Sequence, residues 1–219
     1  ISAFEVIGPN MVGPSSSHTA GAVSIGKMAR KLFKEKVTEV TFTLYGSFAR
    51  TYKGHGTDRA LLGGVLGFAT DDLRIRDAFS WAEKMGVKYQ YIADKEFVPD
   101  HPNTVDIRMT GETGTKMQVQ GQSIGGGKIK ITQINGINVE FTGEYSTLVV
   151  KQIDKPGVVT HITQCLSNQN VNIAFMRLFR EGKGKTAYSV VESDERIPDE
   201  ILEEIRQNPY VQEILLIQI

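Results

Sequence analysis

Hydrophobic and polar residues follow regular, short periods in the last third of the chain, and this pattern predicts a small α+β domain. Four apolar, β-branched runs predict strands, and two segments with apolar residues at helical spacing predict helices. The strands are expected over 146–153, 171–179, 185–192 and 211–217, and the helices over 156–167 and 197–206. Pro156 would stand in the first helical turn, where its missing N–H costs nothing. The order βαββαβ is that of the ferredoxin-like fold, an antiparallel sheet with both helices on one face.

Residues 1–145 are less regular, and they predict a second α+β domain that ends near 143–146. A helix is expected over 17–33, with Ala22, Ile25, Ala29 and Leu32 facing inward. Gly21 and Gly26 would weaken this helix unless another segment packs closely against them. Further helices are expected over 58–68 and 76–85, strands over 3–7, 39–45, 88–93 and 105–110, a turn over 111–116, and a hairpin over 128–142 that turns at Asn135 and Gly136. The predicted domains are therefore 1–145 and 146–219.

Composition excludes several classes of protein. The chain has 219 residues, with 25 basic and 25 acidic side chains, so it lacks the basic surface that nucleic-acid binding requires. The longest apolar run, 60–69, is too short to cross a bilayer, and no basic-then-apolar leader is seen. A cytoplasmic protein is therefore expected. A single cysteine excludes an internal disulfide and a multi-thiolate metal site.

A polar loop at 13–19 (GPSSSHT) directly precedes the first predicted helix. Hydroxyls and free backbone N–H groups at a helix start form a cradle for a carboxylate or a phosphate. The alternative is an N-cap, for which one serine is enough. Because Ser15, Ser16 and Ser17 are followed by His18 and Thr19, the loop holds more polar groups than capping requires, and we favour a ligand site.

Three further loops carry polar residues. His55 lies between two glycines, so a ligand can approach its imidazole, which could act as a general acid or base. Alternatively the glycines only allow a tight turn, with Thr57 or Asp58 capping the next helix. The loop 101–104 (HPNT) is more typical of a structural turn. The loop 123–128 (SIGGGK) fits a hairpin connection and a backbone approach to a ligand equally well.

Three of the four histidines, His18, His55 and His101, lie in these loops, but none has the spacing of a metal ligand. A metal held by this chain alone is not expected. Cys165 lies on the apolar stripe of a predicted helix, which favours a small buried residue over a nucleophile. The residues alone therefore indicate a small anionic metabolite as the ligand, and they do not name a reaction.

The four loops together carry a more specific signal. In the order GPSSSHT, YGS with GHGTD, HPNT and SIGGG, they resemble the beta chain of the iron–sulfur-dependent L-serine dehydratases, of which GPSSSHT is a specific signature. Residues 147–219, with DKPG at 154–157 and NVNI at 170–173, resemble an ACT domain, an amino-acid-sensing module. The first half is also similar to the intervening substrate-binding-type domain of some phosphoglycerate dehydrogenases. The resemblance covers essentially the whole chain.

This resemblance implies a subunit of an L-serine ammonia-lyase, which converts L-serine to pyruvate, a gluconeogenic precursor, and ammonia. A partner alpha chain would carry the cysteines of a four-iron four-sulfur cluster, one iron acting as a Lewis acid on the substrate hydroxyl. This chain, inactive by itself, would form the other wall of the site. His18 and His55 would be catalytic, in protonic or orienting roles, and the substrate would be bound by Ser15, Ser16, Ser17, Thr19, His101, Asn103 and Thr104.

The resemblance to ACT domains implies a regulatory site. In such modules an amino acid commonly lies between the first strand–helix loop and a facing subunit, which here points to Gln152, Asp154, Gly157 and Asn172. Related serine-sensing modules often have His where Gln152 stands, so a dimerisation module with an empty site is the alternative. A homodimer through 146–219 is expected, because exposed sheet edges favour pairing. The alternative for the whole chain is a non-catalytic amino-acid-sensing regulatory subunit, which would hardly need three histidines in its loops.

Overall fold

The computed structural model describes residues 10–218, and the chain divides into two units, Ile1–Gly136 and Ile137–Ile219. The predicted domains, 1–145 and 146–219, remain a prediction and differ from these units only in the segment 137–145. The strand predicted over 3–7 lies outside the described residues. Within 10–218, no helix combines the length and the apolar character needed to span a membrane.

A mixed β-sheet forms the framework of the first unit. Its strands are β1 (Val37–Leu44), β2 (Lys88–Ala93), β3 (Thr104–Gly111), β4 (Lys116–Gly125) and β5 (Lys128–Ile134). The order is β2-β1-β3-β4-β5, and it continues into β6 (Ile137–Phe141), the first strand beyond the division between the units. β1 and β2 are parallel, whereas β3 and β4 join the sheet in antiparallel pairs.

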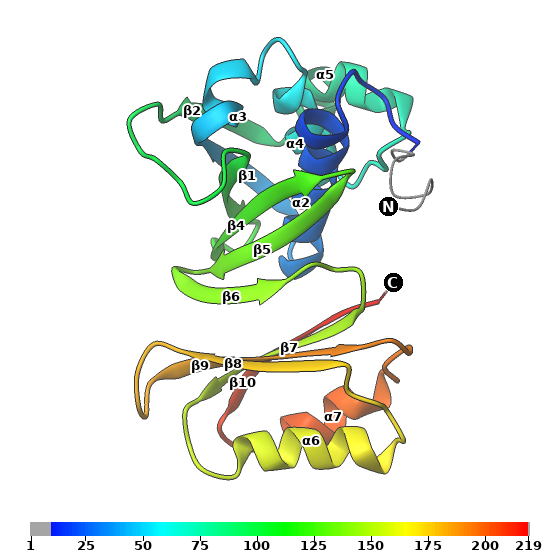
Figure 1. Cartoon of the computed structure of the whole chain (residues 1–219), viewed down its shortest axis with the longest axis vertical. Coiled ribbons are helices and arrows are strands. Elements are labelled where there is room, and N and C mark those ends of the chain that lie inside the picture. Colours follow the sequence, from blue (N-terminus) through cyan, green and yellow to red (C-terminus); the bar gives the residue numbers. More distant parts are fainter. Residues whose placement is uncertain (1–9, 219) are drawn as a thin grey trace. The chain divides into compact units, whose positions relative to one another are not determined.

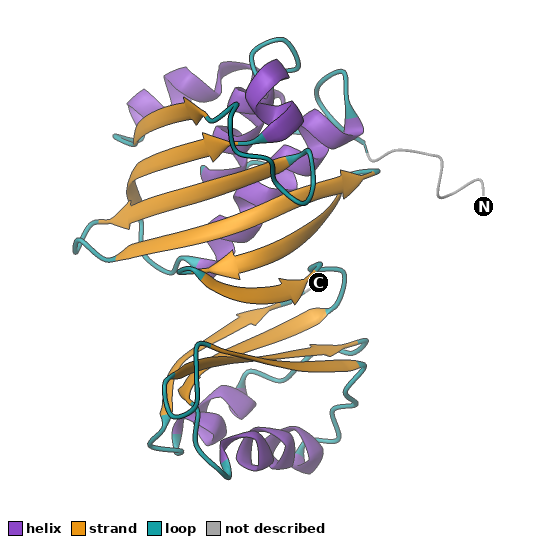
Figure 2. Ribbon diagram, turned by 60° about the vertical axis from the view of Figure 1, so that its left-hand side comes forward, coloured by secondary structure: helices purple, strands orange, loops and turns teal. Residues whose placement is uncertain are grey.

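Helices cover one face of this sheet (Figures 1 and 2). They are η1 (Ser16–Ala20), α2 (Gly21–Leu32), α3 (Gly46–Thr51), α4 (Thr57–Val65), η2 (Leu73–Asp77) and α5 (Ala78–Lys84). The predicted inward stripe of α2 is confirmed, because Ala22, Ile25, Ala29 and Leu32 are fully buried. Close packing against Gly21 and Gly26, the two glycines expected to weaken this helix, is also confirmed. A Cβ on Gly26 would lie 2.5 Å from the carbonyl oxygen of Leu61, and one on Gly21 would overlap Ser123 Oγ.

Several predictions for the first unit need correction. The helix expected to start at Ser17 begins instead as the π-helix η1, and α3 and β4 were not predicted. Because β4 extends to Gly125, the SIGGG segment is only partly a loop, and its hairpin connection is the pair Gly126 and Gly127. The hairpin turn at Asn135 and Gly136 is confirmed, since both residues have positive φ, 52° and 78°.

The second unit contains the predicted βαββαβ order. Its elements are β7 (Ser146–Ile153), α6 (Val158–Asn168), β8 (Phe175–Arg180), β9 (Thr186–Ser193), α7 (Glu200–Arg206) and β10 (Val211–Ile217). The antiparallel sheet has the order β10-β7-β9-β8, with both helices on one face (Figure 1). Leu148, Val150, Ile162 and Ile201 are among its buried core residues. The α+β fold class is therefore confirmed.

Two local predictions in the second unit are wrong. The strand expected to start at Val171 starts only at Phe175. Pro156 does not lie in the first turn of α6, because this helix starts at Val158 after Gly157. Gly157 has a φ of 87°, which a residue with a side chain rarely adopts, and so the chain turns there before the helix begins. Pro156 belongs to this preceding turn.

Candidate functional site

The GPSSSHT loop leads directly into η1, a π-helical segment that continues into α2. Ser15 is extended, and its Oγ accepts the backbone N–H of His18 at 3.1 Å. The N-cap interpretation is therefore correct for Ser15. The hydroxyls of Ser16 and Ser17 make no hydrogen bond to any residue within 10–218. Isolated π-helical turns occur frequently at functional sites, and this one leaves two hydroxyls available to a ligand.

Two of the predicted histidines lie side by side. The rings of His18 and His55 have centroids 4.8 Å apart and are nearly perpendicular, at 83°. His18 Nε2 lies 3.0 Å from Ser47 Oγ, and the ring of Phe48 contacts His18 edge-on. Burial, together with the neighbouring His55, lowers the pKa of His18 below its usual value of 6.5. His18 is therefore neutral at pH 7 and can accept a proton.

His55 is fixed through its backbone, while one of its ring nitrogens has no described partner. Its carbonyl oxygen accepts the hydroxyl of Thr19 at 3.2 Å, and its N–H donates to the carbonyl oxygen of Thr51 at 3.1 Å. His55 Nδ1 is buried and has no hydrogen-bond partner among the described residues. The predicted cap at Thr57 is wrong, because Gly56 occupies the N-cap position and Thr57 Oγ1 is buried without a described partner.

The HPNT segment forms a hydrogen-bonded turn. His101 Nδ1 accepts the N–H of Asn103 at 3.2 Å, and the hydroxyl of Thr104 donates to the carbonyl oxygen of His101 at 2.6 Å. Burial and, secondarily, the positive charge of Lys130 lower the pKa of His101. The ring nitrogen of His101 therefore serves the turn itself. Asn103 differs, because its Oδ1 is buried and unpartnered in the described part of the chain.

The SIGGG segment contacts both the HPNT turn and the helix start that follows the GPSSSHT loop. The N–H of Ser123, at the end of β4, donates to the carbonyl oxygen of Asn103 at 3.0 Å. Ser123 is fully buried and packs against Gly21, where α2 begins. Its Oγ has no hydrogen-bond partner within 10–218. Only a glycine at position 21 lets β4 approach the helix start so closely.

Four buried polar atoms without a described partner thus gather in the predicted loops: His55 Nδ1, Thr57 Oγ1, Asn103 Oδ1 and Ser123 Oγ. An unsatisfied buried polar group costs on the order of 1–3 kcal/mol, so each of these atoms calls for a partner, which a ligand or a water molecule can supply. The sequence offers Thr57 or Asp58 as a helix cap and gives the loop of Ser123 no preference between a hairpin and a ligand contact, because sequence alone does not show that Thr57 and Ser123 are buried.

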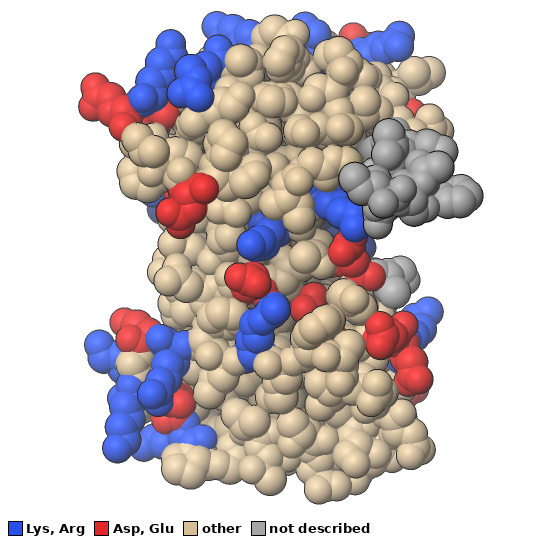
Figure 3. Space-filling view, in the orientation of Figure 1, with Lys and Arg blue, Asp and Glu red and all other residues tan. Residues whose placement is uncertain are grey.

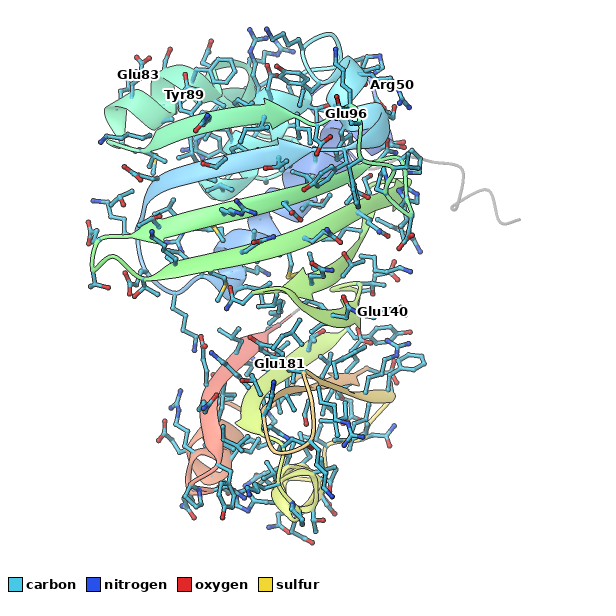
Figure 4. All side chains as sticks on the ribbon, turned by 90° about the vertical axis from the view of Figure 1, so that its left-hand side faces the viewer. Arg50, Glu83, Tyr89, Glu96, Glu140 and Glu181 are labelled. Carbon is cyan, nitrogen blue, oxygen red and sulfur yellow. The ribbon has the colours of Figure 1, made fainter. Side chains whose placement is uncertain are left out.

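A polar network on the other face of the sheet holds the segment with Ser47 in place. The carboxylate of Asp106 accepts the hydroxyl of Tyr45 at 3.0 Å and the side-chain amides of Gln118 and Gln120 at 3.1 and 3.0 Å. Polar side chains cover this face (Figure 4). Burial and the negative charge of Asp106 raise the pKa of Tyr45 to about 12. The network fixes Tyr45 and therefore the position of Ser47 two residues later.

The described residues provide no site for a metal or an iron–sulfur cluster. Nowhere in 10–218 do three or more His, Cys, Asp or Glu residues gather in a way that could hold a metal ion. The single cysteine, Cys165, is buried in α6, and burial raises the pKa of its thiol. Cluster ligation requires several accessible thiolates, so this donor set does not fit such a cluster.

The four predicted regulatory residues do not converge on one pocket within the second unit. Gln152 is buried, and its Oε1 accepts the hydroxyl of Ser189 at 3.1 Å. Asp154 pairs with Arg180 at 3.3 Å, which ties it to the β8–β9 hairpin. Asn172 is exposed and lines a groove with Thr163, Ser167, Asn170, Val171 and Ile173.

Comparison with known proteins identifies both halves of the chain. Residues 3–92 match the family model of the serine dehydratase beta chain, and residues 146–209 match that of the ACT domain. A probable L-serine dehydratase beta chain from Bacillus subtilis (strain 168) is 42% identical over 210 residues, which are 96% of this chain and 94% of that protein. An L-serine dehydratase beta chain from Peptoniphilus asaccharolyticus is 48% identical over 172 residues, 78% of each chain.

A more distant similarity extends to another class of enzyme. D-3-phosphoglycerate dehydrogenase from Bacillus subtilis (strain 168) is 26% identical over 200 residues, which cover 90% of this chain but only 37% of that protein. The two beta chains, in contrast, match over 94% and 78% of their own length and at higher identity. The chain belongs to the L-serine dehydratase beta-chain family and is a subunit of a lyase.

Proposed function

We propose that this chain forms one wall of the L-serine site of the dehydratase and that an alpha chain completes the site. The observation that carries the proposal is the contact between His18 and His55, together with four buried polar atoms in the predicted loops that have no partner within 10–218, on His55, Thr57, Asn103 and Ser123. L-Serine has an ammonium group, a carboxylate and a hydroxyl, and these groups can form hydrogen bonds with such atoms. The name of the related beta chains implies an alpha-chain partner.

The helix start is proposed to hold the substrate carboxylate. The hydroxyls of Ser16 and Ser17, which have no partner within 10–218, and the N–H groups at the positive end of the η1–α2 segment suit a negative group. Ser15 caps this segment, because its Oγ accepts a hydrogen bond from the N–H of His18. Thr19 positions His55 by its hydrogen bond to the carbonyl oxygen. Asn103 would add a polar contact, while His101 and Thr104 shape the turn that presents it.

His18 and His55 are proposed to hold or move protons during elimination. Loss of the α proton and of the β hydroxyl from L-serine gives aminoacrylate, which hydrolyses to pyruvate and ammonia. His18 is suited to proton transfer because its lowered pKa keeps it neutral at pH 7. The buried Nδ1 of His55 needs a partner, which a substrate could supply. Because the donor set of this chain does not fit an iron–sulfur cluster, the proposal assigns that cluster to the alpha chain.

The test is pyruvate formation from L-serine by the complex of this chain with its alpha chain. His18→Ala and His55→Ala should each lower kcat by on the order of 100-fold or more, the range typical of lost general acid–base catalysis. His161→Gln is the matched control, since His161 lies on α6 in the second unit and should leave turnover unchanged. Size-exclusion chromatography checks that each variant still assembles.

Near-normal turnover by both loop variants would remove these histidines from the mechanism. Binding of an amino acid by this chain, without any need for the loop histidines in turnover, would favour a regulatory subunit instead.

We also propose that the second unit binds an amino acid near Asn172 and pairs with a second copy through β8. This strand is at the edge of its sheet and exposes Phe175 and Leu178.

A further inference from the structure

Besides the proposed L-serine site, the first unit has a pocket, here termed the second pocket, beside the turn that carries His55. Its volume is about 270 Å³, and it opens between the segment 12–14, the turn 53–56, α4 and η2. Thr19 and His55 are among its lining residues, whereas the three serines and His18 are not. The pocket is therefore adjacent to the proposed L-serine site and is lined by a largely different set of residues.

The charged residues that line this pocket are all basic. Lys53, Arg59 and Arg76 contribute to its wall, and no acidic residue within 10–218 does so. None of the three forms an ion pair with a carboxylate of the described chain. Instead, the guanidinium of Arg59 lies over the ring of Phe79 at 5.6 Å, and the Lys53 ammonium lies over the ring of Tyr52 at 5.8 Å. Three like charges around one cavity create a positive potential that an anion would relieve.

Two further features strengthen this potential. Gly56, which lines the pocket, is the N-cap of α4, so the positive end of the helix dipole faces the same region. The nearest acidic side chain in sequence, Asp58, does not line the pocket; burial is the larger influence on its pKa and raises it, while the charges of Arg59 and Lys53 act in the opposite direction. Figure 3 shows basic side chains gathered along the upper margin of the first unit, where α3 and α5 lie in Figure 1.

We propose that this pocket binds a small dianion of the phosphate class, either inorganic phosphate or the phosphomonoester of a small metabolite. L-Serine is neutral overall, and its ammonium group would be repelled by the three cations of a wall in which the described residues place no carboxylate. A phosphate oxygen set suits arginine, which donates two parallel hydrogen bonds to one group. A bound dianion would contact the turn 54–56 and so restrain His55, which links this site to the proposed L-serine site.

The test is isothermal titration calorimetry of the full chain with inorganic phosphate at pH 7.5 and low salt. We expect one phosphate bound per chain. Arg59→Gln, Arg76→Gln and Lys53→Gln should each weaken binding about tenfold, the usual scale for loss of one charge-assisted hydrogen bond. These side chains are exposed, so the variants should fold, which circular dichroism verifies. Arg50→Gln is the matched control, because Arg50 is an exposed arginine of α3 that does not line the pocket (Figure 4).

A second titration with glycerol phosphate separates the two sources of the dianion. Tighter binding than inorganic phosphate indicates a phosphomonoester, and equal or weaker binding indicates phosphate itself. Three results would overturn the proposal: no binding of either probe, an equal loss in Arg50→Gln, or displacement of phosphate by L-serine. None of these depends on turnover, and His18→Ala should bind phosphate normally, so the outcome is independent of the catalytic proposal.

Discussion

At the scale of single residues, the protonation of His18 is set by its surroundings. Its ring lies between Phe48 and His55, with Ser47 Oγ at 3.0 Å from Nε2. Burial disfavours the imidazolium ion, and a second histidine at a centroid distance of 4.8 Å adds repulsion if both carry charge. Both effects act in the same direction, toward the neutral ring that a proton acceptor requires.

The titration of His18 should therefore be centred below pH 6.5 in the folded chain. His55→Gln should raise the midpoint only in part, because burial is the larger cause. Histidine side-chain NMR signals, assigned with a His18→Gln variant, would measure both values. The unfolded chain binds this proton more tightly than the folded chain does. The contribution of His18 to the free energy of unfolding is therefore complete above pH 6.5, and it is lost as the pH falls through the lowered pKa. A His18 midpoint at or above 6.5 would contradict this account.

The sequence predicted some site residues and not others, for a physical reason. The GPSSSHT loop is recognisable because its polar residues are consecutive and precede a helix. The roles of Ser47, Thr57 and Ser123 depend on contacts with distant segments, such as Ser123 against Gly21. The basic residues of the second pocket are likewise scattered along the chain and come together only in the fold. Local pattern carries no information on such contacts.

At the scale of elements, α2 and α4 approach each other through glycines. A Cβ on Gly26 would lie 2.5 Å from the carbonyl oxygen of Leu61, and one on Gly64 would overlap the carbonyl oxygen of Val23. The two glycines also face each other, since a Cβ on either would lie 3.0 Å from the Cα of the other. This contact places η1, which continues into α2, against the first turn of α4.

Alanine at either position should destabilise the chain, although alanine favours helix formation over glycine by about 1 kcal/mol. Overpacking a close contact costs about 1–3 kcal/mol, and here the contacts are with backbone atoms that cannot rotate away. Gly26→Ala and Gly64→Ala should thus lower the free energy of unfolding, as measured by urea denaturation. Gly182→Ala, with only the end of the Lys185 side chain nearby at 3.6 Å, is the control and should be close to neutral. Equal stability of all three variants would show that the helices can move apart.

Elements marked by runs of apolar and β-branched residues were predicted well, whereas α3 and β4 were missed. The strands β2, β7 and β10 have the predicted bounds, because apolar and β-branched residues mark them. α3 has only six residues and shows too little helical period to be recognised. β4 ends in SIG, which indicates a loop, and Gly121 lies in its middle. This glycine is required because a Cβ there would lie 2.5 Å from Ile25 Cγ2.

At the scale of the whole molecule, the chain offers hydroxyls, imidazoles and basic groups but no set of thiolates. The site it forms is therefore incomplete for a reaction in which the proposed iron–sulfur cluster takes part. The single sulfhydryl group, on Cys165, is 4% exposed and is surrounded by the apolar core of the second unit. Its Sγ lies 3.7 Å from His161 Nε2, a neighbour on the same helix. A buried thiol with a raised pKa is a poor metal ligand, since thiolate is the ligating form.

Cys165→Ala should therefore leave the iron content of the complex with the alpha chain unchanged. Iron and acid-labile sulfide per complex, together with visible absorbance, would measure this, and stability should fall by about 1 kcal/mol or more because a small cavity replaces the sulfur. The wild-type chain on its own, taken through anaerobic reconstitution with iron and sulfide and then desalted, should retain neither element. An alanine variant of a ligating alpha-chain cysteine is the matched control and should lose the cluster. Loss of iron in Cys165→Ala, with assembly intact, would instead place a cluster ligand on this chain and contradict the assignment of the cluster to its partner.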